Sequence, residues 1–157
     1  MSLPKILRSQ ATVRFQDCDP YGHLNNSKYI DYFMNAREDQ LLENYDLDIY
    51  ALSSSEGLGW VVAQTQIAYL QPALLMEKVS ISTKIIEYDT KRITVEFEMW
   101  NSDESFLKSL MWSRFVHFDL KARRSAVHTE KFMGIFAEVH HPTEAGTFDE
   151  RLRSVRR

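Results

Sequence analysis

A long segment without glycine or proline, residues 27–45, constrains the fold of this chain more than any other feature of its sequence. It is typical of one helix, because its apolar residues recur every three or four positions. These residues cover an unusually broad face: Tyr29, Ile30, Phe33, Met34, Ala36, Leu41, Leu42 and Tyr45. A face of this width favours a helix that is wrapped by a curved sheet. Arg37 interrupts the face, and we expect it to pair with a nearby carboxylate, with contact to a ligand as the alternative.

Extended segments surround this helix. Four of them follow it, at residues 60–70, 77–88, 91–101 and 106–120. The short turns at residues 89–90 and 102–104 join the last three segments into an antiparallel meander. A fifth strand precedes the helix, where Val13 and Phe15 alternate with polar neighbours over residues 12–16. The order of one strand, one long helix and four strands predicts an α+β fold, with a five-stranded antiparallel sheet wrapped around the central helix.

Less regular segments connect and extend this core. Residues 45–59 are rich in turn-forming side chains and predict a loop with a short helical turn at residues 49–52. Residues 129–139 predict a short amphipathic helix, and residues 142–157 form a polar, arginine-rich tail. We expect this tail to fray or to dock on the surface.

The length of 157 residues fits a single domain, which we expect to span residues 1–157, with its core at about 11–120 and a short C-terminal extension at about 121–157. The net charge of −3 argues against a general nucleic-acid-binding surface. The single cysteine excludes an internal disulfide and a cysteine-based zinc site, so we expect a cytoplasmic protein. We also expect no secretory signal and no membrane span.

The turn that leads into the long helix carries the residues with chemical content. Residues 17–22 have the sequence Asp-Cys-Asp-Pro-Tyr-Gly, in which Pro20 restricts the backbone and Gly22 permits conformations that other residues resist. Asn25 or Asn26 can cap the helix that follows. A carboxylate beside the unpaired N–H groups of a helix start provides a base and an oxyanion site, the minimum needed to hydrolyse an ester or thioester. By spacing alone, the same residues also fit an ordinary turn.

This turn resembles the motif of the 4-hydroxybenzoyl-CoA thioesterase family of hotdog-fold enzymes. Residues 22–26, Gly-His-Leu-Asn-Asn, together with Tyr29, are also similar to the Gly-His-Val-Asn-Asn-x-x-Tyr motif of acyl-CoA and acyl-ACP thioesterases. The resemblance implies hydrolysis of an acyl-CoA or acyl-ACP thioester, with no metal and no cofactor. It implies that Asp19 is the catalytic base or nucleophile and that the Asn26 amide stabilises the oxyanion. One departure is Met76-Glu77, where the family often has Gly-Asp; Glu77 would take the place of that aspartate.

Further site residues follow from the same motif. Asp19 is favoured over Asp17, for which a turn-stabilising role is more natural. His23 either hydrogen-bonds Asp19, orients the water or contacts the thioester oxygen, or it holds the loop by bonding to backbone groups. Tyr29 and Phe33 either wall the acyl pocket or belong to the core.

Two more assignments complete the expected site. Cys18 is expected to be a small buried residue without a catalytic role. The resemblance places contacts with CoA phosphates near Lys91 and Arg92, and the C-terminal arginines are a weaker alternative for that contact.

Exposed sheet edges favour a homodimer or a homotetramer, because proteins cover or pair such edges. By resemblance, the substrate would lie between two subunits, with Asp19 of one facing residues 60–63 of the other. Two other functions remain open, a hotdog dehydratase or hydratase and a non-catalytic acyl-CoA-binding protein.

Overall fold

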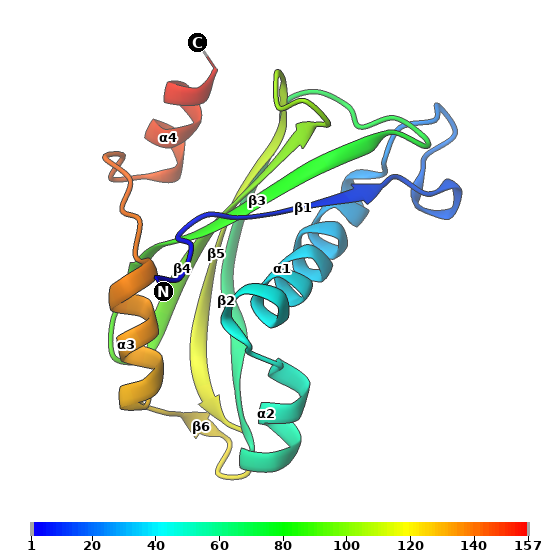
Figure 1. Cartoon of the computed structure of the whole chain (residues 1–157). Helices are drawn as coiled ribbons and strands as arrows, with labels where there is room; N and C mark the ends of the chain where they lie inside the picture. Colours follow the sequence, from blue (N-terminus) through cyan, green and yellow to red (C-terminus); the bar gives the residue numbers. More distant parts are fainter. Residues whose placement is uncertain (1, 157) are drawn as a thin grey trace.

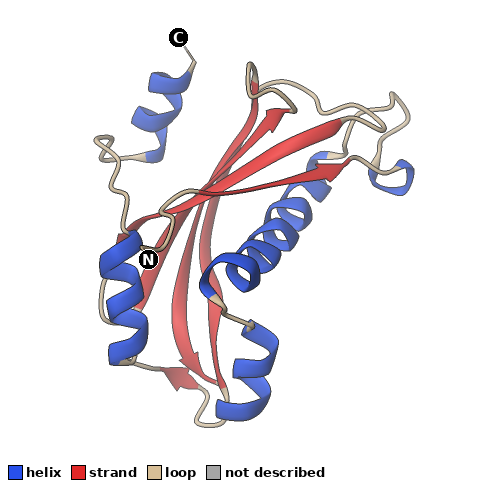
Figure 2. Cartoon of the chain, viewed as in Figure 1, coloured by secondary structure: helices blue, strands red, loops and turns tan. Residues whose placement is uncertain are grey.

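The computed structural model describes residues 2–156, and it places one long helix against a curled antiparallel sheet (Figures 1 and 2). The helix α1 spans Tyr29–Tyr45 and follows a 3-10 turn at Asn26–Lys28. The long strands pair in the order β1-β3-β4-β5-β2, and the short β6 pairs with β5. The strands are β1 (Leu7–Thr12), β2 (Leu58–Tyr69), β3 (Lys78–Tyr88), β4 (Arg92–Asn101), β5 (Leu107–Asp119) and β6 (Arg124–Ser125). The predicted α+β architecture is therefore confirmed.

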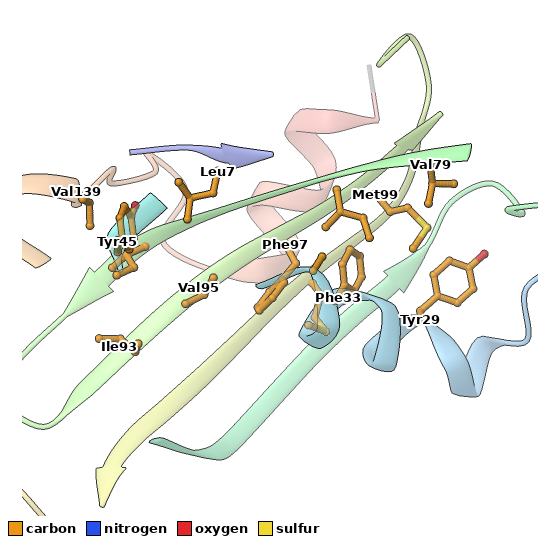
Figure 3. Packing of buried hydrophobic residues seen from close by; sticks show 14 of the residues in the cluster. Leu7, Tyr29, Phe33, Tyr45, Val79, Ile93, Val95, Phe97, Met99 and Val139 are labelled. Carbon is orange, nitrogen blue, oxygen red and sulfur yellow. The ribbon is translucent and has the colours of Figure 1, made fainter. Parts of the chain in front are cut away.

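The core lies between α1 and the concave face of the sheet (Figure 3). Phe33 is fully buried there, and its ring centroid lies 5.6 Å from that of Phe97 on β4. Side chains alternate between the two faces of a strand, so Val95, Phe97 and Met99 face α1. This arrangement explains the clean alternation of apolar residues in β4. Within residues 2–156, no helix is both long enough and apolar enough to cross a membrane.

The prediction of a strand at residues 12–16 is wrong. The first strand is β1, which pairs antiparallel with β3, whereas residues Phe15–Asp17 form a 3-10 turn. Val13 is buried, but Phe15 is 80% exposed. The backbone leaves the sheet after Thr12, because the Asp17 N–H donates to the Arg14 carbonyl and closes a turn. Pairing with β3 determines the position of the first strand. The alternation of polar and apolar residues at 12–16 does not encode this pairing.

Two of the predicted connecting elements are longer or more ordered than expected. The helix α2 spans Ile49–Glu56, capped at its start by the Asp48 carboxylate, so it extends beyond the predicted turn at residues 49–52. The C-terminal tail contains a helix, α4, at Phe148–Val155. The predicted amphipathic helix is confirmed as α3, at Glu130–Val139.

Strand β2 forms one edge of the sheet, and much of its apolar start is exposed. Val61 and Val62 are 41% and 51% exposed, respectively, because no strand pairs with the outer edge of β2 among the described residues. Trp60 is partly covered, since its ring packs against Phe132 and Phe136 of α3.

Helix α4 docks on the face of the sheet opposite α1 through a buried ionic cluster. Arg151 donates from Nε to Glu96 at 2.7 Å and from Nη2 to Glu98 at 3.2 Å. Lys84 Nζ lies 3.3 Å from the Glu96 carboxylate. Burial raises the pKa of Glu96, but the hydrogen bond from Arg151 and further bonds outweigh it and lower that pKa to about 2. Burial, with the adjacent Glu96, raises the pKa of Glu98.

The turn before β3 has Met76 at the position where the resembled family often has glycine. Met76 adopts a left-handed conformation with φ of 66°, and its side chain is exposed. The adjacent Glu77 accepts a hydrogen bond from the Leu74 N–H at 2.9 Å and pairs with Lys108 at 3.1 Å. The turn is therefore kept, at the cost of a strained backbone at Met76.

Replacing Met76 with glycine is expected to raise the free energy of unfolding by about 0.5–1 kcal/mol. The left-handed conformation costs a residue with a Cβ roughly 1–2 kcal/mol, and glycine removes this strain. The greater flexibility of glycine in the unfolded chain lowers the gain by about 0.5–1 kcal/mol. Urea denaturation measures the change. Leu75→Gly is the control and should lower stability, since Leu75 does not have a positive φ. A destabilised Met76→Gly variant would contradict the assignment of strain.

Candidate active site

The loop that carries Asp19 is closed by its own backbone. The Asp19 N–H donates to the His23 carbonyl at 2.8 Å, and the Gly22 N–H donates to the Asp19 carbonyl at 3.1 Å. Gly22 has a φ of 77°, which only glycine adopts readily. Asp19 Oδ1 accepts from the Tyr21 and His23 N–H groups, at 2.8 and 3.1 Å. Within residues 2–156, Oδ2 has no hydrogen-bond partner in the protein, so this oxygen remains free to accept a proton.

A second segment holds this loop against the sheet. The Leu24 N–H donates to the Ala73 carbonyl at 2.8 Å, and the Leu75 N–H donates to the Gly22 carbonyl at 2.9 Å. These bonds fix the C-terminal end of the turn that presents Asp19, and the bond from the Asn25 N–H to the Asp17 carbonyl, at 2.9 Å, closes its start. The carboxylate therefore sits on a rigid support rather than on a free loop.

The start of the helix presents the backbone N–H that was expected to stabilise the oxyanion. Asn25 is the cap, because its side-chain oxygen accepts from the Ser27 N–H at 3.0 Å. The Asn26 carbonyl accepts from the Tyr69 hydroxyl at 3.1 Å, which orients this peptide. No acceptor for the Asn26 N–H is found in the described part of the chain. An unpaired N–H at a helix start is suited to a developing negative charge.

These groups meet around one cavity of about 280 Å³. Asp19, His23, Asn26 and Tyr29 line it, together with Leu24, Tyr69, Leu70, Gln71 and Pro72. Gly22 and Asn25 do not line it, but they shape the loop and the helix start that do. The structure thus brings the expected base and the expected oxyanion donor to the same space.

His23 contributes its backbone to the loop and its side chain to the cavity. Its N–H donates to the Asp19 carboxylate and its carbonyl accepts from the Asp19 N–H. The imidazole makes no hydrogen bond to the Asp19 carboxylate, and it lines the cavity. Its ring is therefore placed to contact a bound thioester, and that role remains a prediction.

Asp17 and Cys18 have other partners. Asp17 Oδ2 accepts from the Tyr32 hydroxyl at 2.6 Å, and burial together with this bond raises the pKa of Tyr32 to about 12. Cys18 is half-buried rather than fully buried, and its Sγ donates to the Arg14 carbonyl at 3.4 Å. Burial and the nearby carboxylates raise the pKa of its thiol, which disfavours the reactive thiolate.

Tyr29 lines the inner end of the cavity, whereas Phe33 lies in the core. Tyr29 is 1% exposed, its hydroxyl accepts from the Ala73 N–H at 3.2 Å, and its ring contacts Tyr69 edge-on at 5.0 Å. Phe33, one turn further along α1, lies in the core and does not line this cavity (Figure 3). A role of Phe33 in acyl-chain preference therefore remains a prediction that would act through packing.

Lys91 and Arg92 are not near Asp19 of the same chain. Strand β3 starts beside the Asp19 loop, where the Val13 N–H donates to the Glu77 carbonyl, and it ends at Tyr88. At about 3.3 Å per residue, this strand separates the two regions by roughly 30 Å. Arg92 pairs with Asp89 at the hairpin, at 3.7 Å. Any contact of these cations with a substrate at Asp19 would need a second copy of the chain.

Sequence reasoning missed a second cavity, of about 260 Å³, between the sheet and the helices α1, α2 and α3. Its lining is mainly apolar, with Met34, Leu41, Ile85, Val95 and Phe115 among the residues. No local signal could have revealed it, since seven helices and strands contribute to its wall.

Arg37 also lines this second cavity, and the prediction of an ion pair for it is wrong. Its Nη1 donates to the Thr83 hydroxyl at 2.8 Å, and no carboxylate of residues 2–156 lies within 4 Å of its guanidinium. Burial lowers the pKa of Arg37 to about 10.

A comparison with known families is decisive for the membership of this chain. Residues 13–144 match the sequence model of the Thioesterase-like superfamily. The chain belongs to this superfamily. The match includes the Asp19 loop, α1 and all of the strands β2 to β6, so the family and the site geometry concern the same part of the molecule.

Individual relatives agree with the family. The chain is 26% identical over 119 residues to the long-chain acyl-CoA thioesterase FadM of Escherichia coli, which covers 76% of this chain and 88% of FadM. A Staphylococcus aureus protein solved in complex with CoA has a TM-score of 0.80 at 18% identity, covering 97% of this chain and 94% of that one. A 1,4-dihydroxy-2-naphthoyl-CoA thioesterase from Synechocystis has a TM-score of 0.76 at 16% identity, covering 87% and 99%. These structures support the hotdog fold.

Proposed function

We propose that this superfamily member hydrolyses the thioester of an acyl-CoA. The observation that carries the proposal is the pairing of a free carboxylate oxygen, Asp19 Oδ2, with the unpaired Asn26 N–H on one cavity. The two groups are the base and the oxyanion donor that thioester hydrolysis requires. Membership of a thioesterase superfamily supports the same reaction.

The reaction proceeds by addition of water to the thioester carbonyl. Asp19 takes a proton from the water as its oxygen forms a bond to the carbonyl carbon. The carbonyl oxygen becomes an oxyanion, which accepts a hydrogen bond from the Asn26 N–H. The carbon–sulfur bond then breaks, and the proton held by Asp19 neutralises the departing CoA thiolate. In the alternative route, Asp19 attacks the carbonyl directly and forms an anhydride that water cleaves.

A homodimer would complete this site. The outer edge of β2 is free to pair with β2 of a second copy across a two-fold axis, and such pairing is antiparallel. Tyr69, at the end of β2, contacts Asn26, so the end of one β2 lies at the candidate site. The partner's β2 would then begin near this site. Arg92 pairs with Val116 and Val116 pairs with Val61, so the Lys91–Arg92 hairpin lies level with the start of β2. These cations of one copy would face Asp19 of the other.

A substrate screen with purified protein tests the proposal. Acyl-CoAs of different chain lengths and aryl-CoAs are supplied, and release of free thiol is measured, with kcat of at least about 1 s⁻¹ expected for the best substrate. Light scattering at each dilution reports the oligomeric state beside the activity. Binding without thiol release would instead support a non-catalytic acyl-CoA-binding protein, and hydration of an enoyl-CoA would support a hydratase. Full activity from a demonstrated monomer would contradict the shared site.

A further inference from the structure

The cavity between the sheet and α1, α2 and α3 holds a charge that the proposed chemistry at Asp19 does not use. Arg37 is only 6% exposed, and it lies among apolar side chains. A buried cation is costly unless a counter-charge or hydrogen bonds compensate it. Within residues 2–156, Arg37 has one hydrogen bond, to Thr83, and no ion pair. The site therefore supplies a cation and leaves most of its donors uncommitted.

A chain of buried hydrogen bonds holds Arg37 in place. The Thr83 hydroxyl accepts from Arg37 and donates to Gln40 Oε1 at 2.6 Å. Gln40 Nε2 donates in turn to the Ser9 hydroxyl at 2.8 Å and to the Ile81 carbonyl at 3.1 Å. This network fixes one edge of the guanidinium, so that the other nitrogens are presented in a set orientation. Preorganised donors of this kind are typical of a binding site.

The remaining nitrogens of Arg37 are accessible. In the described residues, the side-chain atoms that are both sealed from solvent and unpaired are His117 Nε2 and His141 Nδ1. Arg37 Nε and Nη2 have no hydrogen-bond partner within the described residues, and they are absent from this pair of atoms because they are not sealed from solvent. Since the residue as a whole is buried, these nitrogens can be reached through the cavity that Arg37 lines.

We infer that Arg37 binds a carboxylate at the far end of the acyl group, so that the preferred substrates are CoA thioesters of dicarboxylic acids. This inference rests on the proposed function. Guanidinium and carboxylate match as a two-point hydrogen-bonded pair, and the apolar walls fit the methylene chain between the two ends. A neutral acyl chain would leave the buried cation without a partner.

The acyl group would reach this cavity from the second subunit. Tyr29 and Phe33 fill the space on the Asp19 side within one chain, and Arg37 lies two helical turns beyond Tyr29, about 12 Å along α1. Val62 also lines the cavity and is 51% exposed on the free edge of β2. Pairing of β2 edges would bring the partner's Asp19 loop toward this side. Each cavity would then receive the acyl group of a thioester cleaved by the opposite chain.

Glu38 is the one acidic side chain that lines the cavity in the described part of the chain. Its carboxylate accepts from the Tyr50 hydroxyl at 2.8 Å on the exposed side of the molecule. A dicarboxylic substrate passes this negative charge on its way to Arg37. Glu38→Gln is therefore expected to raise kcat/KM for such substrates and to leave monocarboxylic ones nearly unchanged.

The test compares two matched series of CoA thioesters, with acyl chains of four to twelve carbons that either carry or lack a terminal carboxylate. At the best chain length, the wild-type protein is expected to prefer the dicarboxylic substrate at least about tenfold in kcat/KM, the effect of one hydrogen bond to a charged group. Arg37→Met keeps the length of the side chain and removes the charge. It is expected to abolish the preference by lowering kcat/KM for the dicarboxylic series at least about tenfold relative to the monocarboxylic series.

A second measurement uses the wild-type protein, so it does not depend on whether Arg37→Met folds. It also separates carboxylate binding by Arg37 from the proposed thioester hydrolysis. Free dicarboxylic acids are expected to raise the Tm of the wild-type protein, and monocarboxylic acids of equal length are not. Equal or weaker turnover of the dicarboxylic series at every length would overturn the role of Arg37, with hydrolysis itself intact. Absence of thiol release from both series would overturn the proposed function, and the Tm comparison would still decide whether Arg37 binds a carboxylate.

Discussion

Replacing Asp19 with alanine is expected to lower kcat by about 10²–10⁴, the usual contribution of a positioned general base. Asp19 Oδ2 is the free carboxylate oxygen on the cavity that also presents the Asn26 N–H. Asp19→Asn is the sharper variant, because its side-chain oxygen can still accept from the Tyr21 and His23 N–H groups and keep the loop closed. Steady-state kinetics on the best substrate and thermal melts of all three proteins measure activity and folding separately.

Asp17→Ala is the matched control. This carboxylate bonds to the Tyr32 hydroxyl, so its loss should lower the free energy of unfolding by about 1–3 kcal/mol and change kcat only a few-fold. If Asp17→Ala were inactive and Asp19→Ala turned over normally, the catalytic assignment would be wrong.

Replacing Arg151 with methionine is expected to lower the free energy of unfolding by about 3 kcal/mol. Removing one partner of a buried ionic cluster typically costs 3–5 kcal/mol, because the opposite charge stays buried without compensation. The lower end applies here, since Lys84 still pairs with Glu96 after the change. Because the pKa of Glu98 is raised, a larger fraction of its carboxyl is ionised at about pH 8 than at neutral pH. Urea denaturation at about pH 8 therefore gives the clearest measurement.

Two controls test the origin of this effect. Arg153→Met changes an exposed arginine of the same helix α4 and should alter stability by less than about 0.5 kcal/mol. Adding Glu98→Gln to Arg151→Met should restore much of the loss, because Glu96 keeps its ion pair with Lys84 and the Glu98 charge is removed. If the double variant were as unstable as the single one, packing of the arginine stem would be the cause.

The elements with a long, regular pattern could be predicted from the sequence. Helix α1 and strands β3 to β5 are each ten residues or longer, and the apolar residues in their sequences recur regularly, so local periodicity is enough to define them. Strand β1 is short, and its position depends on its pairing with β3, which a local pattern does not encode. Helix α4 depends in the same way on carboxylates more than fifty residues away.

The candidate site likewise has one part that the local sequence predicts and another part that depends on long-range packing. The Asp19 loop and the helix cap lie within a dozen consecutive residues, so turn chemistry predicted the turn and the cap, and the family resemblance selected Asp19. Arg37 was predicted to have a nearby carboxylate because charged residues are rarely buried without one. Its actual partner, Thr83, is on a distant strand, and the cavity beside it is assembled from three helices and the sheet. Long-range packing of this kind leaves no trace in residue spacing.

The location of Arg151 also bears on how this chain evolved. The superfamily match ends at residue 144, whereas α4 begins at Phe148, so the cation lies outside the matched residues and its carboxylates lie inside them. Without that helix, Glu96 and Glu98 would lose the positive charge that Arg151 supplies. Homologues that lack the appended helix should therefore carry neutral or apolar side chains at these two positions, and the helix and the acidic pair should be inherited or lost together.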